Sequence, residues 1–168
     1  MFLSFIATDE TDKNLFFFEL SGIKKKIRSP CVGICSTTYG DLVCRGCRRF
    51  SHEIVGWNGY SEEQKISILE RLKQIKKEVV SQHLLIANLS RFEALCEEVG
   101  FESVDLDEKK YAVLAYLVTK SEGLNFGGLE VKGLCEGSLD VSKLMSILES
   151  EMYVRAQAHY ERNFKIKV

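Results

Sequence analysis

Four cysteines in one short stretch constrain this chain more than any other feature of its sequence. They lie within residues 30–49 at the spacing C-x3-C, eight residues, C-x2-C, at positions Cys31, Cys35, Cys44 and Cys47. Two close pairs joined by a short loop suit one tetrahedral site, because each pair can direct two sulfur atoms toward a common point. Gly33 and Gly46 lie inside the two pairs, where a tight turn favours a residue without a Cβ. Residues 30–49 are therefore predicted to form a metal-binding knuckle.

Disulfides and free thiols are the alternatives to a bound metal. Disulfide frameworks are typical of small secreted domains. The start of this chain does not resemble a secretion signal, because acidic residues interrupt its apolar runs at Asp9, Glu10, Asp12 and Glu19. We therefore expect a cytoplasmic protein with reduced thiols, and we favour a metal or cluster over disulfides.

The spacing leaves the identity of the metal open between zinc and an iron-sulfur cluster. Both use four thiolates, so the number of ligands does not separate them. The C-x2-C pair is typical of a zinc knuckle, whereas the C-x3-C pair is less so, and spacing alone modestly favours zinc. A cluster is larger than one ion and needs apolar cover, for which the knuckle offers Val32, Ile34, Leu42 and Val43.

The runs SPCVGIC, GDLVCRGCRRFSHEIVGW and YSEEQKISILERL resemble a known family. They are similar to the YdhL-like family of uncharacterised bacterial proteins, commonly labelled predicted iron-sulfur proteins, over about residues 29–72. The resemblance implies an iron-sulfur cluster on the four cysteines and implies no known substrate or reaction. This chain adds a segment before the family-like stretch and a long segment after it.

Composition indicates a soluble globular protein with an uneven charge distribution. The 168 residues are 45% hydrophobic and 28% charged, and no apolar run approaches membrane-spanning length. The net charge of −1 hides a basic region around the knuckle. Its residues are Lys24, Lys25, Lys26, Arg28, Arg45, Arg48 and Arg49. We expect these residues to form a basic surface that faces a protein partner or, with less support, nucleic acid.

The segment around the knuckle is predicted to be mainly helical. Aromatic-rich runs in residues 2–7 and 15–20 could pair as a short β-hairpin, the alternative being an extension without fixed structure. After the knuckle, Ser51 is expected to cap a short helix. Ser61 and Gln64 form a capping box for a long helix that reaches the mid eighties.

The C-terminal part shows three further helical patterns. They are expected to begin near Ser90, Asp107 and Asp140, and the last is expected to fray from Arg155. The glycine-rich stretch between the second and third of these helical patterns is predicted to form a loop with a small hairpin. The predicted fold is thus mainly α: a knuckle, a long helix and a small helical bundle. The predicted domains are an extension at 1–28, a metal module with its helix at 29–89, and a helical domain at 90–168.

No motif of an active site is present in the sequence, which favours a non-enzymatic role. His52 and Trp57 could lie beside the metal site. Cys96 is expected to be a buried thiol, and Cys135 lies in the glycine-rich loop. The first hypothesis is a metal-binding module that contacts a protein partner. The second is an iron-sulfur electron-transfer protein, and the third is a zinc knuckle that binds nucleic acid.

Overall fold

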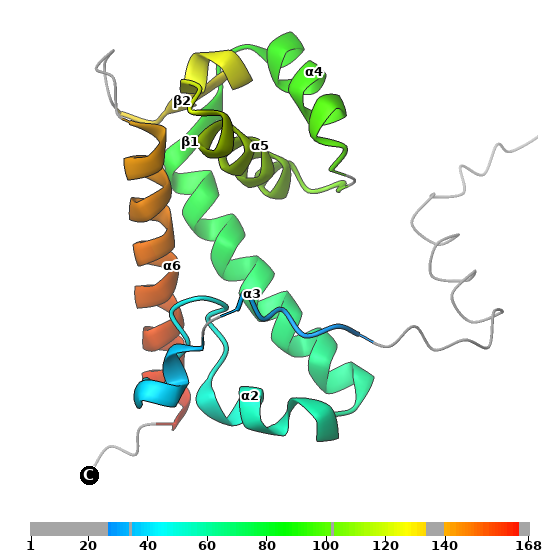
Figure 1. Ribbon diagram of the computed structural model, residues 1–168, viewed down its shortest axis with the longest axis vertical. Coiled ribbons are helices and arrows are strands. Elements are labelled where there is room, and N and C mark those ends of the chain that lie inside the picture. The colour runs from blue at the N-terminus through cyan, green and yellow to red at the C-terminus, as the bar shows by residue number, and fades with distance from the viewer. Residues whose placement is uncertain (1–26, 34, 102, 134–139, 165–168) are drawn as a thin grey trace, which may run out of the picture.

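A computed structural model describes residues 27–33, 35–101, 103–133 and 140–164, and this part of the chain is mainly helical (Figure 1). The predicted fold class is confirmed. The hairpin expected within residues 2–20 lies outside the described residues. The helices are α2 (Ser51–Gly56), α3 (Glu62–His83), α4 (Leu89–Val99), α5 (Leu106–Lys120) and α6 (Val141–Phe164), with short 3-10 turns at Ser36–Tyr39, Trp57–Gly59 and Leu124–Gly127.

Helix α3 is the element around which the other helices pack. It begins at the predicted capping box: the Ser61 side chain accepts from the Gln64 N–H at 3.3 Å, and the Ser61 N–H donates to the Gln64 side chain at 2.9 Å. It ends at His83, as the sequence predicts. Ile75, Val79 and Val80 are buried where α3 packs against α5 and α6. Figure 1 shows α6 running alongside α3.

Three predicted helix starts are displaced in the structure. Helix α4 is capped by Asn88, whose side chain accepts from the Arg91 N–H at 3.0 Å, rather than by Ser90. Helix α5 is capped by Asp105 rather than Asp107. Helix α2 begins at Ser51 itself, and the residue before it, Phe50, donates its N–H to Glu53. In each case the capping position goes to the residue with extended backbone, which the side-chain pattern alone does not reveal.

A two-stranded sheet joins distant parts of the chain. Strand β1 (Leu84–Ile86) pairs antiparallel with β2 (Leu129–Val131), with Leu84 opposite Val131. The sequence predicts a small hairpin within the glycine-rich stretch. In the structure β2, its first apolar piece, pairs with the residues that follow α3, and the second piece, at 134–135, lies outside the described residues. Leu84 of β1 and Leu129 of β2 are both fully buried, and this burial favours the pairing of the two strands.

Helix α6 extends further than expected. It begins after Asp140, as predicted, and continues to Phe164. The prediction that the helix frays from Arg155 is wrong. Ala156 is fully buried, and the centre of the Tyr160 ring lies 5.2 Å from that of the Phe50 ring. The core therefore runs from Val43 and Phe50 at the knuckle through α3 and α5 to the last turns of α6. No helix among the described residues combines the length and apolar character needed to span a membrane.

Candidate metal centre

The knuckle folds as two turns held together by backbone hydrogen bonds. The first is the 3-10 turn Ser36–Tyr39, which ends at Gly40 in the left-handed conformation. The second is closed by the Arg48 N–H donating to the Cys44 carbonyl at 2.9 Å. The Cys44 N–H donates to the Arg49 carbonyl, also at 2.9 Å. These bonds fix the backbone that carries Cys44 and Cys47, which are both buried.

The two turns bring sulfur atoms of different pairs together. The Sγ atoms of Cys35 and Cys44 lie 3.9 Å apart. Two thiolates about 2.3 Å from one tetrahedral ion lie about 3.8 Å apart, so this separation fits a shared ion. Cys47, three residues after Cys44, is buried in the same turn. Two of the four predicted ligands, one from each pair, therefore lie within reach of a single ion.

The Cys31 side chain does not meet the other cysteine sulfur atoms of the knuckle. It is exposed, and its Sγ points to the Gly33 carbonyl at 3.5 Å. Pro30 and Val32 on either side of it line the same cavity as Cys47, so the backbone of Cys31 lies near the second pair. Among the described residues, no three His, Cys, Asp or Glu side chains are arranged to hold a metal ion. Four-cysteine coordination stays a prediction, and it requires the Cys31 side chain to turn inward.

The protonation of the buried thiols differs between Cys44 and Cys47. Burial opposes ionisation of Cys44, but hydrogen bonds from the backbone of Cys47, Ser36 and Gly46 outweigh it and lower its pKa to about 7. Burial raises the pKa of Cys47 despite the hydrogen bond from Arg49. The thiolate is the form that binds metals. Of these two thiols, Cys44 is thus better prepared to act as a ligand near neutral pH.

Arg49 and Trp57 form a layer behind Cys47. Arg49 is only 2% exposed, its Nε donates to the Cys47 Sγ at 3.4 Å, and its guanidinium lies 4.8 Å from the centre of the Trp57 ring. Trp57 was predicted to lie beside the metal site, and it reaches Cys47 through Arg49. A buried guanidinium beside a sulfur stabilises negative charge on that sulfur.

The predicted basic surface needs correction at two residues. Arg49 is buried, as described, and Arg48 is half-buried and forms an ion pair with Glu149 of α6. Arg49 turns toward the buried Cys47, and Arg48 turns toward the half-buried Glu149. Arg28 and Arg45 are exposed, and Arg45 pairs with Asp41 at 2.9 Å. The other predicted members, Lys24, Lys25 and Lys26, lie outside the described residues.

The remaining predicted residues lie elsewhere. The His52 ring packs against Phe164 and Phe50, with ring centres 4.8 and 5.7 Å away, so its described contacts are aromatic. Cys96 is half-buried against the core on α4, and burial raises its pKa. Cys135 lies outside the described residues.

Two structural residues of the site were not found from the sequence. The Glu53 carboxylate accepts from the Phe50 N–H at 2.8 Å and from Arg71 at 2.7 and 2.9 Å. The Arg71 guanidinium lies 3.9 Å from the centre of the Phe50 ring. Phe50 in turn pairs with Val43 of the knuckle as an isolated β-bridge. The position of Glu53, three residues after Phe50, is the spacing at which a side chain caps the start of its own helix. The ion pair with Arg71 has no such local signal, because Arg71 lies on α3 and is distant in sequence.

Fold and site together define a mainly helical protein that carries a cysteine knuckle on its long helix. Residues 29–76 match a family described as a protein of unknown function, DUF1289. The match covers 48 of the 168 residues, from the knuckle through most of α3. It supports the resemblance to an uncharacterised family, while the YdhL-like name and the iron-sulfur label stay predictions. No curated protein and no solved structure matches the chain.

Proposed function

We propose that Cys31, Cys35, Cys44 and Cys47 bind one metal centre, which stabilises the knuckle and presents it to a protein partner. The observation that carries this proposal is the 3.9 Å separation of the Cys35 and Cys44 sulfur atoms. Cysteines nine residues apart meet at the distance expected for two ligands of one ion, and one of them has a lowered pKa.

The sulfur separation also bears on the choice of metal. In a four-iron cluster each iron takes one cysteine, so the sulfur atoms lie further apart than two ligands of one ion. A distance of 3.9 Å between Cys35 and Cys44 supports a single zinc ion, or a smaller iron-sulfur centre in which both cysteines bind the same iron. We favour zinc, and an iron-sulfur electron-transfer protein is the alternative.

The exposed side chains of the knuckle favour a protein partner over nucleic acid. Val32 is 70% exposed, Tyr39 is 84% exposed, and Leu42 is also exposed. Apolar and aromatic side chains of this kind are common at protein interfaces. With Arg48 and Arg49 turned inward, fewer cations remain for phosphate contacts.

Metal analysis of protein purified without oxygen tests this proposal. We expect one zinc per chain in the wild type and loss of the metal in Cys44→Ser, with full stoichiometry in the control Cys96→Ser. Iron with acid-labile sulfide and a visible spectrum that dithionite bleaches reversibly would instead support electron transfer. A Cys44→Ser protein that keeps full metal content would overturn the metal site.

A further inference from the structure

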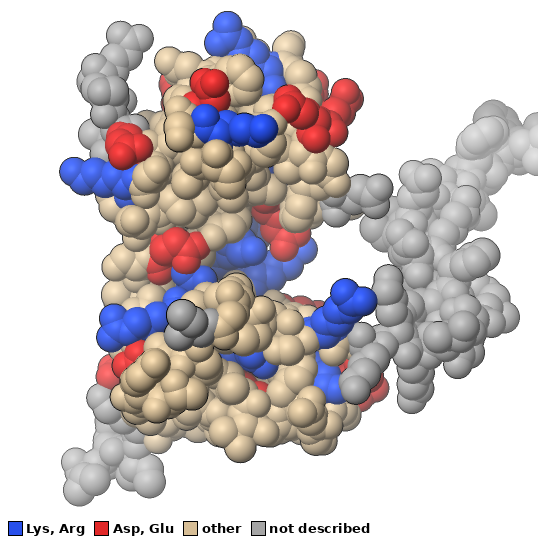
Figure 2. Space-filling view, in the orientation of Figure 1, with Lys and Arg blue, Asp and Glu red and all other residues tan. Residues whose placement is uncertain are grey.

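A cavity of about 550 Å³ lies between the knuckle, α3, α5 and α6. Figure 2 shows the molecule hollowed between the part that carries α4 and α5 and the part that carries the knuckle, with Lys and Arg side chains in the hollow. The cavity has the size of a small-molecule site. Its wall is largely apolar, formed by Val32, Ile66, Leu69, Leu72, Ile75 and Met152.

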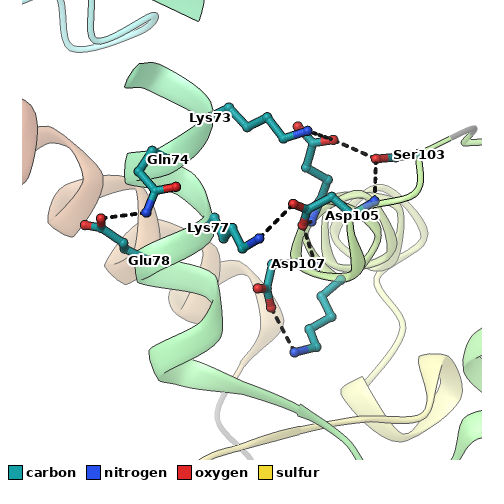
Figure 3. A network of polar contacts seen from close by, with 9 residues as sticks. Lys73, Gln74, Lys77, Glu78, Ser103, Asp105 and Asp107 are labelled. Atoms are coloured by element: carbon teal, nitrogen blue, oxygen red, sulfur yellow. Dashed lines mark hydrogen bonds and ion pairs between the residues drawn. The ribbon is translucent and has the colours of Figure 1, made fainter. Parts of the chain in front are cut away.

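Three cations line this cavity, and two of them have carboxylate partners. Arg48 pairs with Glu149. Lys73 pairs with Glu108 at 3.3 Å, and Glu108 also accepts from Ser103 at 2.7 Å. Figure 3 shows Lys73 reaching from α3 toward this group on α5, and Lys77 reaching Asp105 below it. The charges of Arg48 and Lys73 are thus already balanced.

Lys76 is the third cation, and it differs from the other two. Its Nζ lies 4.8 Å from the centre of the Tyr111 ring. Within the part of the chain that the structure describes, it forms no ion pair with a carboxylate. The ring offers a weak substitute for an anion. A half-buried ammonium that faces a cavity without a direct ion pair is only partly compensated.

The electrostatic surroundings of Lys76 point the same way. Burial lowers the pKa of Lys76, and although Glu108 raises it, the nearby charges of Arg48 and Lys73 lower it further. The net effect disfavours the protonated ammonium. A ligand that brings a negative charge to this position would favour the protonated ammonium and gain affinity from doing so.

We propose that this cavity binds a small organic acid, with its acid group beside Lys76 and its apolar body against the side chains of α3. Aliphatic residues form most of the wall, so the ligand's body is apolar. Glu70 and Glu108 also line the cavity, and their carboxylates repel highly charged anions such as polyphosphates. The ligand therefore carries one acid group.

A pair of probes that differ only in charge tests this site on the full chain. Naphthalene-2-carboxylate and naphthalene-2-carboxamide have the same apolar body, and their binding is measured by isothermal titration calorimetry in a buffer without carboxylates. We expect the wild type to bind the carboxylate about tenfold more tightly than the amide. Lys76→Met should reduce carboxylate affinity to that of the amide and leave the amide affinity unchanged.

Lys77→Met is the matched control, because Lys77 is the next residue on α3, pairs with Asp105 and does not line the cavity. It should bind the carboxylate as the wild type does, and circular dichroism checks that each variant is folded. Equal binding of carboxylate and amide by the wild type would overturn the proposal. So would absence of binding, or a Lys76→Met protein that keeps the preference for the carboxylate.

Discussion

Glu53 joins the knuckle side of the molecule to α3 through a buried ion pair. Replacing it with Gln removes the charge that balances Arg71, whose Nη1 has no hydrogen-bond partner among the described residues. Leaving a largely buried guanidinium uncompensated costs roughly 3 kcal/mol. We expect Glu53→Gln to lower the free energy of unfolding in urea by about that amount.

Glu70→Gln provides the matched control for this prediction. Glu70 precedes Arg71 on α3 but is exposed, so its replacement should change the free energy of unfolding by no more than about 0.5 kcal/mol. Equal effects of the two substitutions would show that the Glu53–Arg71 pair adds little to stability.

Individual residues of the knuckle also show which features the sequence predicts and which it does not. The cysteine spacing pointed to the knuckle, and the structure does bring Cys35 and Cys44 together. The same reasoning placed Arg48 and Arg49 on the surface, because a count of charges does not reveal a partner distant in sequence. Glu149, the partner of Arg48, is about a hundred residues away.

At the scale of elements, Gly128 fixes how β2 meets α4. It has φ of 63°, and a Cβ there would lie 2.3 Å from the Asn88 carbonyl oxygen. Gly128→Ala should therefore add a clash with backbone to the cost of a left-handed residue, together about 3 kcal/mol. Thermal unfolding followed by circular dichroism measures the loss of stability.

Gly133 separates these two costs. It also has a left-handed backbone, with φ of 76°, but no atom of the described residues lies within 4 Å of a Cβ built there. Gly133→Ala should cost only about 1 kcal/mol, the price of the left-handed backbone. If both alanine variants lost equal stability, the close approach to Asn88 would be contributing nothing.

The helices were easier to predict than the sheet. The long amphipathic pattern of α3 carries its own start and end signals, and both were confirmed. The pairing of β1 with β2 has no such local signal, since each strand is three residues long and they lie more than forty residues apart. The extent of α6 was missed for a related reason: Tyr160 looks polar in sequence but packs against Phe50.

Helices α3 and α6 are also joined by a pH-sensitive contact. Burial opposes ionisation of Glu151, but hydrogen bonds from Arg155 and His83 outweigh it and lower the pKa of Glu151 below 4.5. A carboxyl whose pKa is lower in the folded state stabilises the fold above its unfolded pKa, and this stability is lost as the pH falls through the folded pKa. We expect this contribution at neutral pH and its loss below about 4.5.

Glu151→Gln tests that contact. The variant should be less stable than the wild type near neutral pH, and the difference should shrink as the pH falls below about 4.5, measured by urea unfolding across that range. A difference that stays constant with pH would mean that the charge of Glu151 does not contribute.

At the scale of the whole molecule, the knuckle shares one core with the helices. Val43 and Phe50 belong to the same buried cluster as Leu148 and Ala156 of α6, and α3 contributes to that cluster along its length. The sequence divides the chain into a metal module at 29–89 and a helical domain at 90–168, and this division stays a prediction. A shared core favours cooperative unfolding of both parts.

Trp57 makes this cooperativity measurable. It is the single tryptophan and lies behind Cys47, so its fluorescence reports on the knuckle, while far-UV circular dichroism reports mainly on the long helices. We expect the two signals to give the same urea midpoint in the wild type. Cys44→Ser should lower both midpoints together, because losing the metal removes stability from the shared core.

Separate midpoints would have a different meaning. If the Trp57 transition came at lower urea than the helical one, and Cys44→Ser shifted only that transition, the knuckle would be an independent unit whose contacts with α6 add little. Phe164→Ala distinguishes the two cases further. Its ring packs on Phe50 and His52, so with one shared core its removal should lower both midpoints, whereas with independent units it should leave the Trp57 transition unchanged.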